Sequence, residues 1–509
     1  MMRAAATWGA AAQASHVVAT SCPRCGAPLD FAEASNAVRC AHCGVVLLVT
    51  GRRQVLSYTV APRIGRREAR ELVGGVRPVR APATSHAEPR LLLVPYYRLT
   101  AEELSWQRQR IVTRRRSPLE RLDHLGESLL DLASSAGVAS EKRETIELVG
   151  RRIERSFLAC EAGGVASWSL GVRTGVLRLE LFRRDALDPT TTVLPPTLAR
   201  DAALARALTP LRDVDLVHRD VLRATLSLIY FPLWVVETSA RGMRGVTARV
   251  AVLDAVSGAI VARDLDPAAL ASAASASAPP DRVLGFRPLT CPNCGWDLPL
   301  RPEDVVFHCA SCERTWELLG EELEQIASTV VTPPTATTRG EGRGARAVAA
   351  HAGAHRLPVW EVSAATRVVG RSVSRQGAFV DRGSRAELPQ RLYAPAFRWR
   401  ALKALCDLGA RLSRRAPEIE DELSKAPPLV GCSLDRSDAV TLARLIALRL
   451  VTPHEVPSMR RDDLPTVELG APRLRLLWLP FAGDAYSVRE PFTGSALARR
   501  SVEELVARN

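Results

Sequence analysis

The chain has 509 residues, of which 47% are hydrophobic and 24% charged, values typical of folded globular domains rather than of disordered or fibrous chains. Its formal net charge of +14 suggests a polyanionic partner, but nearly all the basic residues are arginines in an alanine-rich chain, a bias that a GC-rich genome also produces. No apolar run reaches the roughly 18–20 residues of a membrane-spanning helix, so we expect no membrane span.

Residues 1–18 open the chain with an alanine-rich segment that contains a single arginine. A signal peptide has a firmer apolar region than this. We therefore expect a disordered leader and a cytoplasmic protein.

The first motif lies at 19–50, where Cys22, Cys25, Cys40 and Cys43 follow the pattern C-x2-C, fourteen residues, C-x2-C. The gap falls just below the usual range for paired CxxC zinc sites, and four thiolates are the set that tetrahedral zinc prefers. So short a segment buries too little apolar surface to fold alone, and metal binding supplies the missing free energy. Because four thiolates leave no open coordination position, the predicted Zn²⁺ is structural rather than catalytic.

Residues 51–268 are predicted to form a mixed helix and antiparallel-sheet domain. The aromatic and apolar segments 91–99 and 226–236 are typical of buried strands. The acid-x-x-Ser-Gly turn in 245–263 predicts a hairpin, with the acid capping local amides. Leucines at helical spacing predict a helix over 117–137, and a second helix is expected over 141–159.

Five arginines crowd into one stretch of this predicted domain. They are Arg108, Arg110, Arg114, Arg115 and Arg116. Arginine clusters bind phosphates, which makes nucleic acid an alternative partner, although a solvated surface is the commoner explanation. A platform that stacks single-stranded bases requires aromatic residues, and few of them lie among these arginines.

The second half of the chain repeats the plan after a predicted linker at 269–287. Residues 288–318 form a second predicted zinc ribbon whose cysteines repeat the spacing of the first, namely Cys291, Cys294, Cys309 and Cys312. A helix and flexible linker are expected over 319–349, followed by a second α+β domain over 350–509. Within it, segments 401–415 and 437–451 show helical periodicity.

The two predicted domains also share short segments. Residues 391–399 resemble 91–99, and the run "LRLLWLPF" at 474–481 resembles "LSLIYFPL" at 226–233. The turn at 490–498 repeats the acid-x-x-Ser/Thr-Gly pattern. A further proline-aromatic segment, 356–364, has no clear counterpart in the first half. The expected fold is therefore α+β, with two tandem units that each carry a ribbon and a mixed domain.

No motif for catalysis is present, and we expect a protein that is not an enzyme. The chain lacks the Gly-Lys pair of a nucleotide-binding P-loop, a His-Glu-x-x-His zinc motif and a Gly-x-Ser-x-Gly elbow. Paired carboxylates such as Glu102 and Glu103 are read as solvated helix faces. His42 and His308 occupy non-equivalent places beside the ligands and are expected at the surface. The three remaining cysteines are expected to be buried structural thiols, and they are Cys160, Cys406 and Cys432.

The ribbons resemble the rubredoxin-like and transcription factor IIB-type zinc ribbons and the metal-binding insert of primosomal replication helicases. The likeness rests on the eight cysteines and on the "CPxCG" segments at 22–26 and 291–295, a small part of the chain. The segments "YFPLWVV" and "DAVSG" are similar to modules of uncharacterised bacterial zinc-ribbon proteins. Because this chain has no ATP-binding motif, the resemblance implies no helicase activity.

The function that these patterns favour is a zinc-binding scaffold or adaptor that holds two structural Zn²⁺ ions and binds protein partners. The alternative is an accessory factor of transcription or replication that binds nucleic acid through the ribbons and the arginine-rich stretch. The sequence leaves the pathway, the partners and the oligomeric state open.

Overall fold

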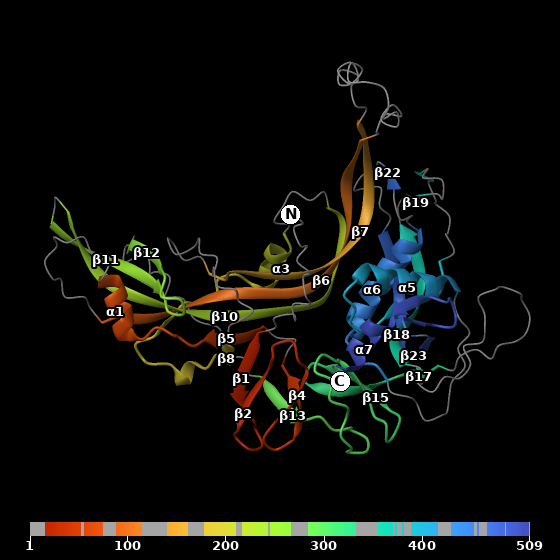
Figure 1. The fold of residues 1–509 in the computed structure, drawn as a ribbon, viewed down its shortest axis with the longest axis horizontal. Helices are drawn as coiled ribbons and strands as arrows, with labels where there is room; N and C mark the ends of the chain where they lie inside the picture. Colours follow the sequence, from red (N-terminus) through yellow and green to blue (C-terminus); the bar gives the residue numbers. More distant parts are fainter. Residues whose placement is uncertain are drawn as a thin grey trace, which may run out of the picture.

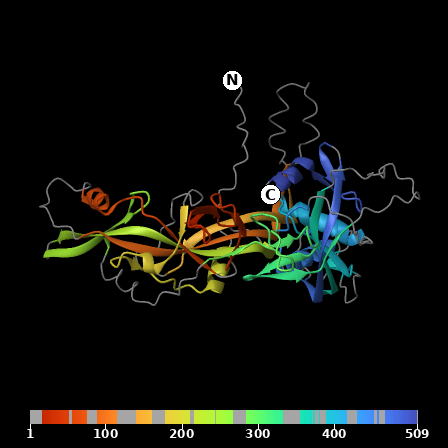
Figure 2. The ribbon, with the colours of Figure 1, turned by 90° about the horizontal axis from the view of Figure 1, so that it is seen from below.

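The longest elements of the protein are three antiparallel strands of one sheet, β6 (Arg90–Arg114), β7 (Ser140–Leu158) and β10 (Leu216–Gly242). In this computed structural model they join the hairpin of β11 (Gly245–Asp254) and β12 (Ile260–Leu265) at one end of an elongated molecule to the C-terminal half at the other (Figures 1 and 2). The structure describes residues 16–51, 55–74, 88–114, 140–160, 178–209, 216–242, 245–265, 284–331, 355–369, 372–373, 379–380, 388–415, 429–451, 456–457, 466–483 and 485–507.

Short strands complete the large sheet on both sides of the long ones. They are β1 (Val17–Ser21), β2 (Pro28–Ala32), β5 (Leu56–Val60), β8 (Arg178–Leu181), β9 (Thr192–Val193) and β22 (Val456–Pro457). The main path of pairing is β2-β1-β8-β5-β10-β6-β7-β22, with β9 on β6 and the hairpin on β10. The same part of the chain also forms helical segments. They are helix α1 (Arg66–Gly74), a 3-10 turn (Arg184–Ala186) and helix α3 (Arg200–Leu208).

Over residues 91–97, strand β6 is apolar on both faces because each face is covered. Leu92 and Val94 pack in one core with the first ribbon, whereas Leu93 and Leu99 pack in another with α3. Further along, Trp106 is fully buried in the core of the C-terminal half. The alternation of strand side chains therefore lets one strand take part in three cores.

The C-terminal half is a smaller sheet covered by helices. Its strands are β17 (Ser328–Val330), β18 (His355–Val369), β21 (Arg391–Pro395), β23 (Thr466–Gly483), β24 (Ser487–Arg489) and β25 (Ala496–Ala498), beside a separate pair of β19 (Ser372–Val373) and β20 (Phe379–Val380). The helices are α5 (Leu402–Arg415), α6 (Arg436–Val451) and α7 (Arg499–Ala507). The helices predicted at 401–415 and 437–451 are thus confirmed.

The two halves share one pattern of strand pairing. In the first, β5 lies parallel to β10, β10 antiparallel to β6, and β6 antiparallel to β7. In the second, β17, β23, β18 and β21 repeat these directions in the same order. The register agrees as well, because Pro95 lies opposite Tyr230 and Pro358 lies opposite Trp478.

This register corrects the expected match between the halves. Residues 93–99 correspond to 356–362, within the segment for which the sequence offered no counterpart, and residues 391–395 correspond to 154–158 at the end of β7. The amide of Ala159 donates to the Pro95 carbonyl at 2.9 Å, and the amide of Ala396 donates to the Pro358 carbonyl at 2.9 Å. Whether the halves fold as independent units stays a prediction.

The helix predicted over 141–159 is wrong, because this segment is the strand β7. Its Gly150 lies against α5, where a Cβ atom would come within 2.6 Å of the Leu402 Cβ. The helix predicted over 117–137 lies outside the described residues.

Three predicted boundaries also change. Val17 and Val18 of the predicted leader belong to β1, and Val18 is fully buried. The predicted linker at 269–287 ends in strand β13 (Gly285–Pro288). The described part of 319–349 contains strands instead of a helix, and these are β16 (Glu322–Ile326) and β17.

Candidate metal centres

The four cysteines of the first ribbon converge on one point. Their Sγ atoms all lie within 4.8 Å of one another, and the pairs Cys22–Cys43 and Cys25–Cys40 are each 3.8 Å apart. Four sulfurs placed about 2.3 Å from a central ion at tetrahedral angles lie about 3.8 Å from one another. The first cluster therefore has the size of a four-thiolate metal site.

The second cluster repeats this arrangement. The Sγ atoms again lie within 4.8 Å of one another, with Cys291–Cys312 and Cys294–Cys309 each 3.5 Å apart. These separations are far longer than the ~2.05 Å of a disulfide bond. Both predicted sets of cysteines can hold a metal ion.

Each CxxC pair sits on a tight hairpin, which explains how the sulfurs come to face inward. The Cys22 carbonyl accepts the amide of Gly26, and the Cys22 amide donates to the Ala27 carbonyl, both at 2.8 Å. The other three pairs make the same two hydrogen bonds. The residue after each pair has a positive φ, which is the left-handed conformation that favours glycine.

Glu313 is the one residue among these four positions that is not glycine. It occupies the place of this glycine in the last pair and adopts φ 58°, close to the values of 74° to 76° at Gly26, Gly44 and Gly295. The hairpin is unchanged, since the Glu313 amide donates to the Cys309 carbonyl at 2.8 Å. A left-handed residue with a Cβ atom costs roughly 1–2 kcal/mol, so this turn carries more strain than the other three.

Backbone amides favour the thiolate form that a metal requires. The amide of Cys43 lowers the pKa of the Cys40 thiol to about 6. The pKa of Cys25 rises to about 12 in spite of the Ala27 amide, because desolvation and the three neighbouring thiols disfavour another negative charge. A divalent cation at the centre would remove this repulsion and stabilise all four thiolates.

The two ribbons are docked onto each other. The first contains β3 (Ala37–Arg39) and β4 (Val46–Thr50), and the second contains β14 (Val306–His308), β15 (Thr315–Leu319) and β16. Both ribbons contribute to one apolar cluster. In Figure 1 they lie side by side below the long strands.

The histidines beside the clusters differ from each other. His42 is exposed, as predicted. His308 is half-buried, and its Nδ1 lies 2.9 Å from the Thr315 Oγ1, so the surface position predicted for it is wrong. Among the three other cysteines, Cys406 and Cys432 are fully buried, as predicted, whereas Cys160 is only half-buried.

The arginine-rich stretch forms the end of β6 rather than a helix or loop. The register places Glu144 of β7 opposite Arg110 and Ser140 opposite Arg114, while Arg108 lies opposite Ile146. Arg115 and Arg116 lie outside the described residues.

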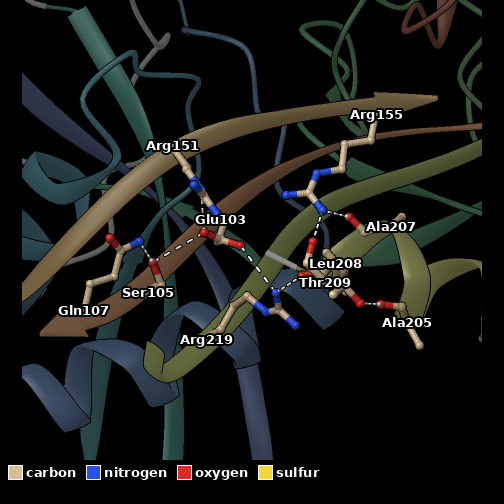
Figure 3. A network of polar contacts seen from close by, with 10 residues as sticks. All are labelled: Glu103, Ser105, Gln107, Arg151, Arg155, Ala205, Ala207, Leu208, Thr209 and Arg219. Carbon is tan, nitrogen blue, oxygen red and sulfur yellow. Dashed lines mark hydrogen bonds and ion pairs between the residues drawn. The ribbon is translucent and has the colours of Figure 1, made fainter. Parts of the chain in front are cut away.

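Sequence reasoning missed a buried polar network on β6. Glu103, read as a solvated helix residue, is fully buried in a strand, where Arg151 Nε donates to its carboxylate at 2.7 Å and Arg219 lies 3.8 Å away (Figure 3). Arg155 and Arg219 also donate to carbonyl groups at the end of α3 (Figure 3). Arginines at a helix C-terminus satisfy carbonyls that lack helical partners, so this network fixes α3 on the sheet.

A second network joins the two halves at a bulge in β10. Arg223 has φ 51°, and its amide donates to the Asp438 carboxylate at 2.7 Å. Its side chain donates to the Ser433 carbonyl at 2.9 Å and forms an ion pair with the buried Glu102. Arg223 lines a cavity of about 310 Å³ between the halves. No local pattern in the sequence predicts this contact, because the adjacent Glu102 and Glu103 also suit a solvated surface.

Searches of protein-family models, of curated proteins and of solved structures each found no match to this chain. None of the described helices is long and apolar enough to cross a membrane. The function proposed next therefore rests on the geometry of the chain itself.

Proposed function

We propose that this protein is a non-catalytic scaffold in which two Zn²⁺ ions hold a double ribbon that binds protein partners. The convergence of eight cysteine sulfurs into two groups of tetrahedral size carries this proposal. Sulfur ligands in tetrahedral sets select Zn²⁺ or iron–sulfur chemistry, and a complete set of four thiolates excludes a bound water that zinc could activate.

Metal content tests the first part of this proposal. Purified wild-type protein should contain about two equivalents of zinc per chain by elemental analysis, and Cys43→Ser should contain about one. Cys406→Ser removes a buried thiol that belongs to neither cysteine cluster and should keep two. Iron in place of zinc, or fewer than one equivalent in the wild type, would overturn the assignment.

Trp296 is the contact that we propose for a protein partner. It follows Gly295 in the second ribbon and is 68% exposed, while the same place in the first ribbon is held by Ala27. Exposed tryptophans are frequent anchors of protein interfaces.

Affinity capture with Trp296→Ala tests this contact without touching a metal ligand. We expect the variant to lose partners that the wild type captures, at unchanged zinc content. Tyr486→Ala is the matched control, because Tyr486 is also exposed, at 87%, and lies outside both ribbons. Identical partner sets for the wild type and Trp296→Ala would reject Trp296 as the anchor, and binding of oligonucleotides that weakens steeply with salt would favour the nucleic-acid alternative.

A further inference from the structure

The first ribbon takes its third strand from the segment that leads into the second ribbon. In the second ribbon, β14, β15 and β16 are consecutive in the chain and pair in that order. In the first ribbon, β3 and β4 are followed by β5, which joins the large sheet instead. The edge of β4 that does not pair with β3 pairs instead with β13 in the antiparallel direction.

The replacement is matched residue for residue. Phe286 of β13 lies opposite Val49, as Leu323 of β16 lies opposite Leu318. Val49 and Leu318 are themselves equivalent positions when the two ribbons are aligned on their cysteines. β13 ends at Pro288, shortly before the metal ligand Cys291. The strand that completes the first ribbon is thus tied directly to the second cluster.

Packing and hydrogen bonds reinforce this tie. Ala37 and Leu48 of the first ribbon share an apolar cluster with Cys291 and Cys309, two of the ligands of the second. The Leu289 amide donates to the Val46 carbonyl of β4 at 3.0 Å. Ligands of the second cluster and the segment just before them therefore pack directly on the first ribbon.

A second contact joins the loops between the cysteine pairs. The Asn36 side chain donates to the Asp304 carbonyl at 3.1 Å, and the Asn36 amide donates to the Pro302 carbonyl. These loops hold corresponding places in the two ribbons. Each ribbon therefore supports the segment that spans the other's cysteine pairs.

We propose that the two metal centres are energetically coupled, so that loss of the ion from one weakens binding at the other through β13 and the paired loops. The proposal rests on the metal binding proposed above. A ribbon of this size lacks the apolar core to stay folded without its ion, so emptying the second cluster loosens β13 and uncovers the edge of β4. Coupling of this kind is reciprocal, and a tenfold change in affinity is typical of linked sites.

Competition with a chromophoric zinc chelator on the full-length protein tests the coupling. The wild type should release both ions in one cooperative transition. Cys309→Ser, which leaves only the first cluster, should bind its zinc about tenfold more weakly than the wild type does, and Cys25→Ser should weaken the second cluster by the same factor. Two independent transitions, with single-cluster affinities equal to those of the wild type, would overturn the proposal while leaving zinc binding intact.

Gly285→Val tests the role of β13 with all eight cysteines in place. A Cβ atom at Gly285 would lie 2.2 Å from the Thr50 Oγ1, so the larger side chain pushes β13 away from β4. We expect two equivalents of zinc at saturation but a first ion that is lost about tenfold more easily and without cooperativity. Gly65→Val is the control, because no atom lies within 4 Å of a Cβ at Gly65. Cooperative release from Gly285→Val would exclude β13 as the connection.

Discussion

At the scale of single residues, Asp304 shows how the second ribbon is fixed on the C-terminal half. Asp304 is buried, and a Cβ atom at Gly431 would lie only 2.2 Å from the Asp304 Oδ1. Burial raises the pKa of Asp304 to about 7, although Arg301 lies 3.7 Å from the Oδ2 atom. The backbone of residues 431–432 thus packs on an acid that would be ionised in water.

This raised pKa predicts a pH-dependent difference between the wild type and Asp304→Asn. The folded chain binds the proton more tightly than the unfolded chain, so the wild-type free energy of unfolding falls as pH rises from about 4 to about 7. Asparagine has no such dependence. From about pH 5.5 to about pH 8 the stability of Asp304→Asn relative to the wild type should rise by about 2 kcal/mol.

Urea unfolding of both proteins across this pH range measures the difference. Metal loss at low pH affects the two proteins alike and cancels in the comparison. Arg301 and Glu303 are the charged groups near Asp304, and both are present in each protein. A stability difference that stays constant with pH would show that Asp304 has the same pKa in the folded and unfolded chain.

At the scale of elements, the packing of α5 depends on a residue without a side chain. Gly409 lies in the middle of α5, where glycine normally weakens a helix by about 1 kcal/mol relative to alanine. Here a Cβ atom would lie 2.4 Å from the Ile446 Cδ1 of α6 and 2.5 Å from the Tyr393 carbonyl oxygen of β21. The glycine lets two helices and a strand meet.

We therefore expect Gly409→Ala to destabilise the protein by about 1–3 kcal/mol, against the usual gain from this change in a helix. Thermal or urea unfolding measures the effect. Gly65→Ala, which meets no neighbouring atom, should be near neutral. An increase in stability for Gly409→Ala would mean that α5 shifts freely on β21.

At the scale of the whole molecule, the long strands unite the two halves. Leu104, Trp106, Leu148 and Leu222 of the first half belong to the same apolar core as the helices of the second. Val456 of the second half pairs with β7 of the first. The halves are therefore packed together and not merely tethered by linkers.

Arg223 should be a principal polar contact of this junction. Arg223→Ala removes its ion pair with Glu102 and its bond to Ser433, leaving Glu102 buried without that partner, and should cost about 2–4 kcal/mol. Arg223→Gly should recover about 1 kcal/mol of this loss, because glycine tolerates the positive φ.

Urea unfolding followed by probes in each half measures this effect, and we expect the two transitions to separate in Arg223→Ala. Arg367→Ala is the control, since its ion pair with Glu468 lies within the second half and is exposed, and its loss should cost less than about 1 kcal/mol. If Arg223→Ala and Arg367→Ala lower the free energy of unfolding equally, Arg223 is not a principal polar contact between the halves.

The sequence by itself determined the features that depend on local chemistry. The four cysteine pairs and the hairpins around Asp254 and Glu490 each follow from a few neighbouring residues, and the structure confirms them. Helices α5 and α6 were predictable as well, since a long apolar stripe at helical spacing has few other folds. The zinc assignment and the choice of partner stay predictions.

Tertiary structure alone decided the features that depend on distant pairing. The segment of β7 has apolar residues that suit a helix, and only its place beside β6 makes it a strand. Glu103 and Arg223 are charged residues that a surface would also accept, and their burial follows from partners that are distant in the sequence. The pairing of β13 with β4 joins the start of the chain to the segment before the second ribbon. No local pattern can encode such a pairing, because it is fixed by the edge that remains open once the rest of the fold is in place.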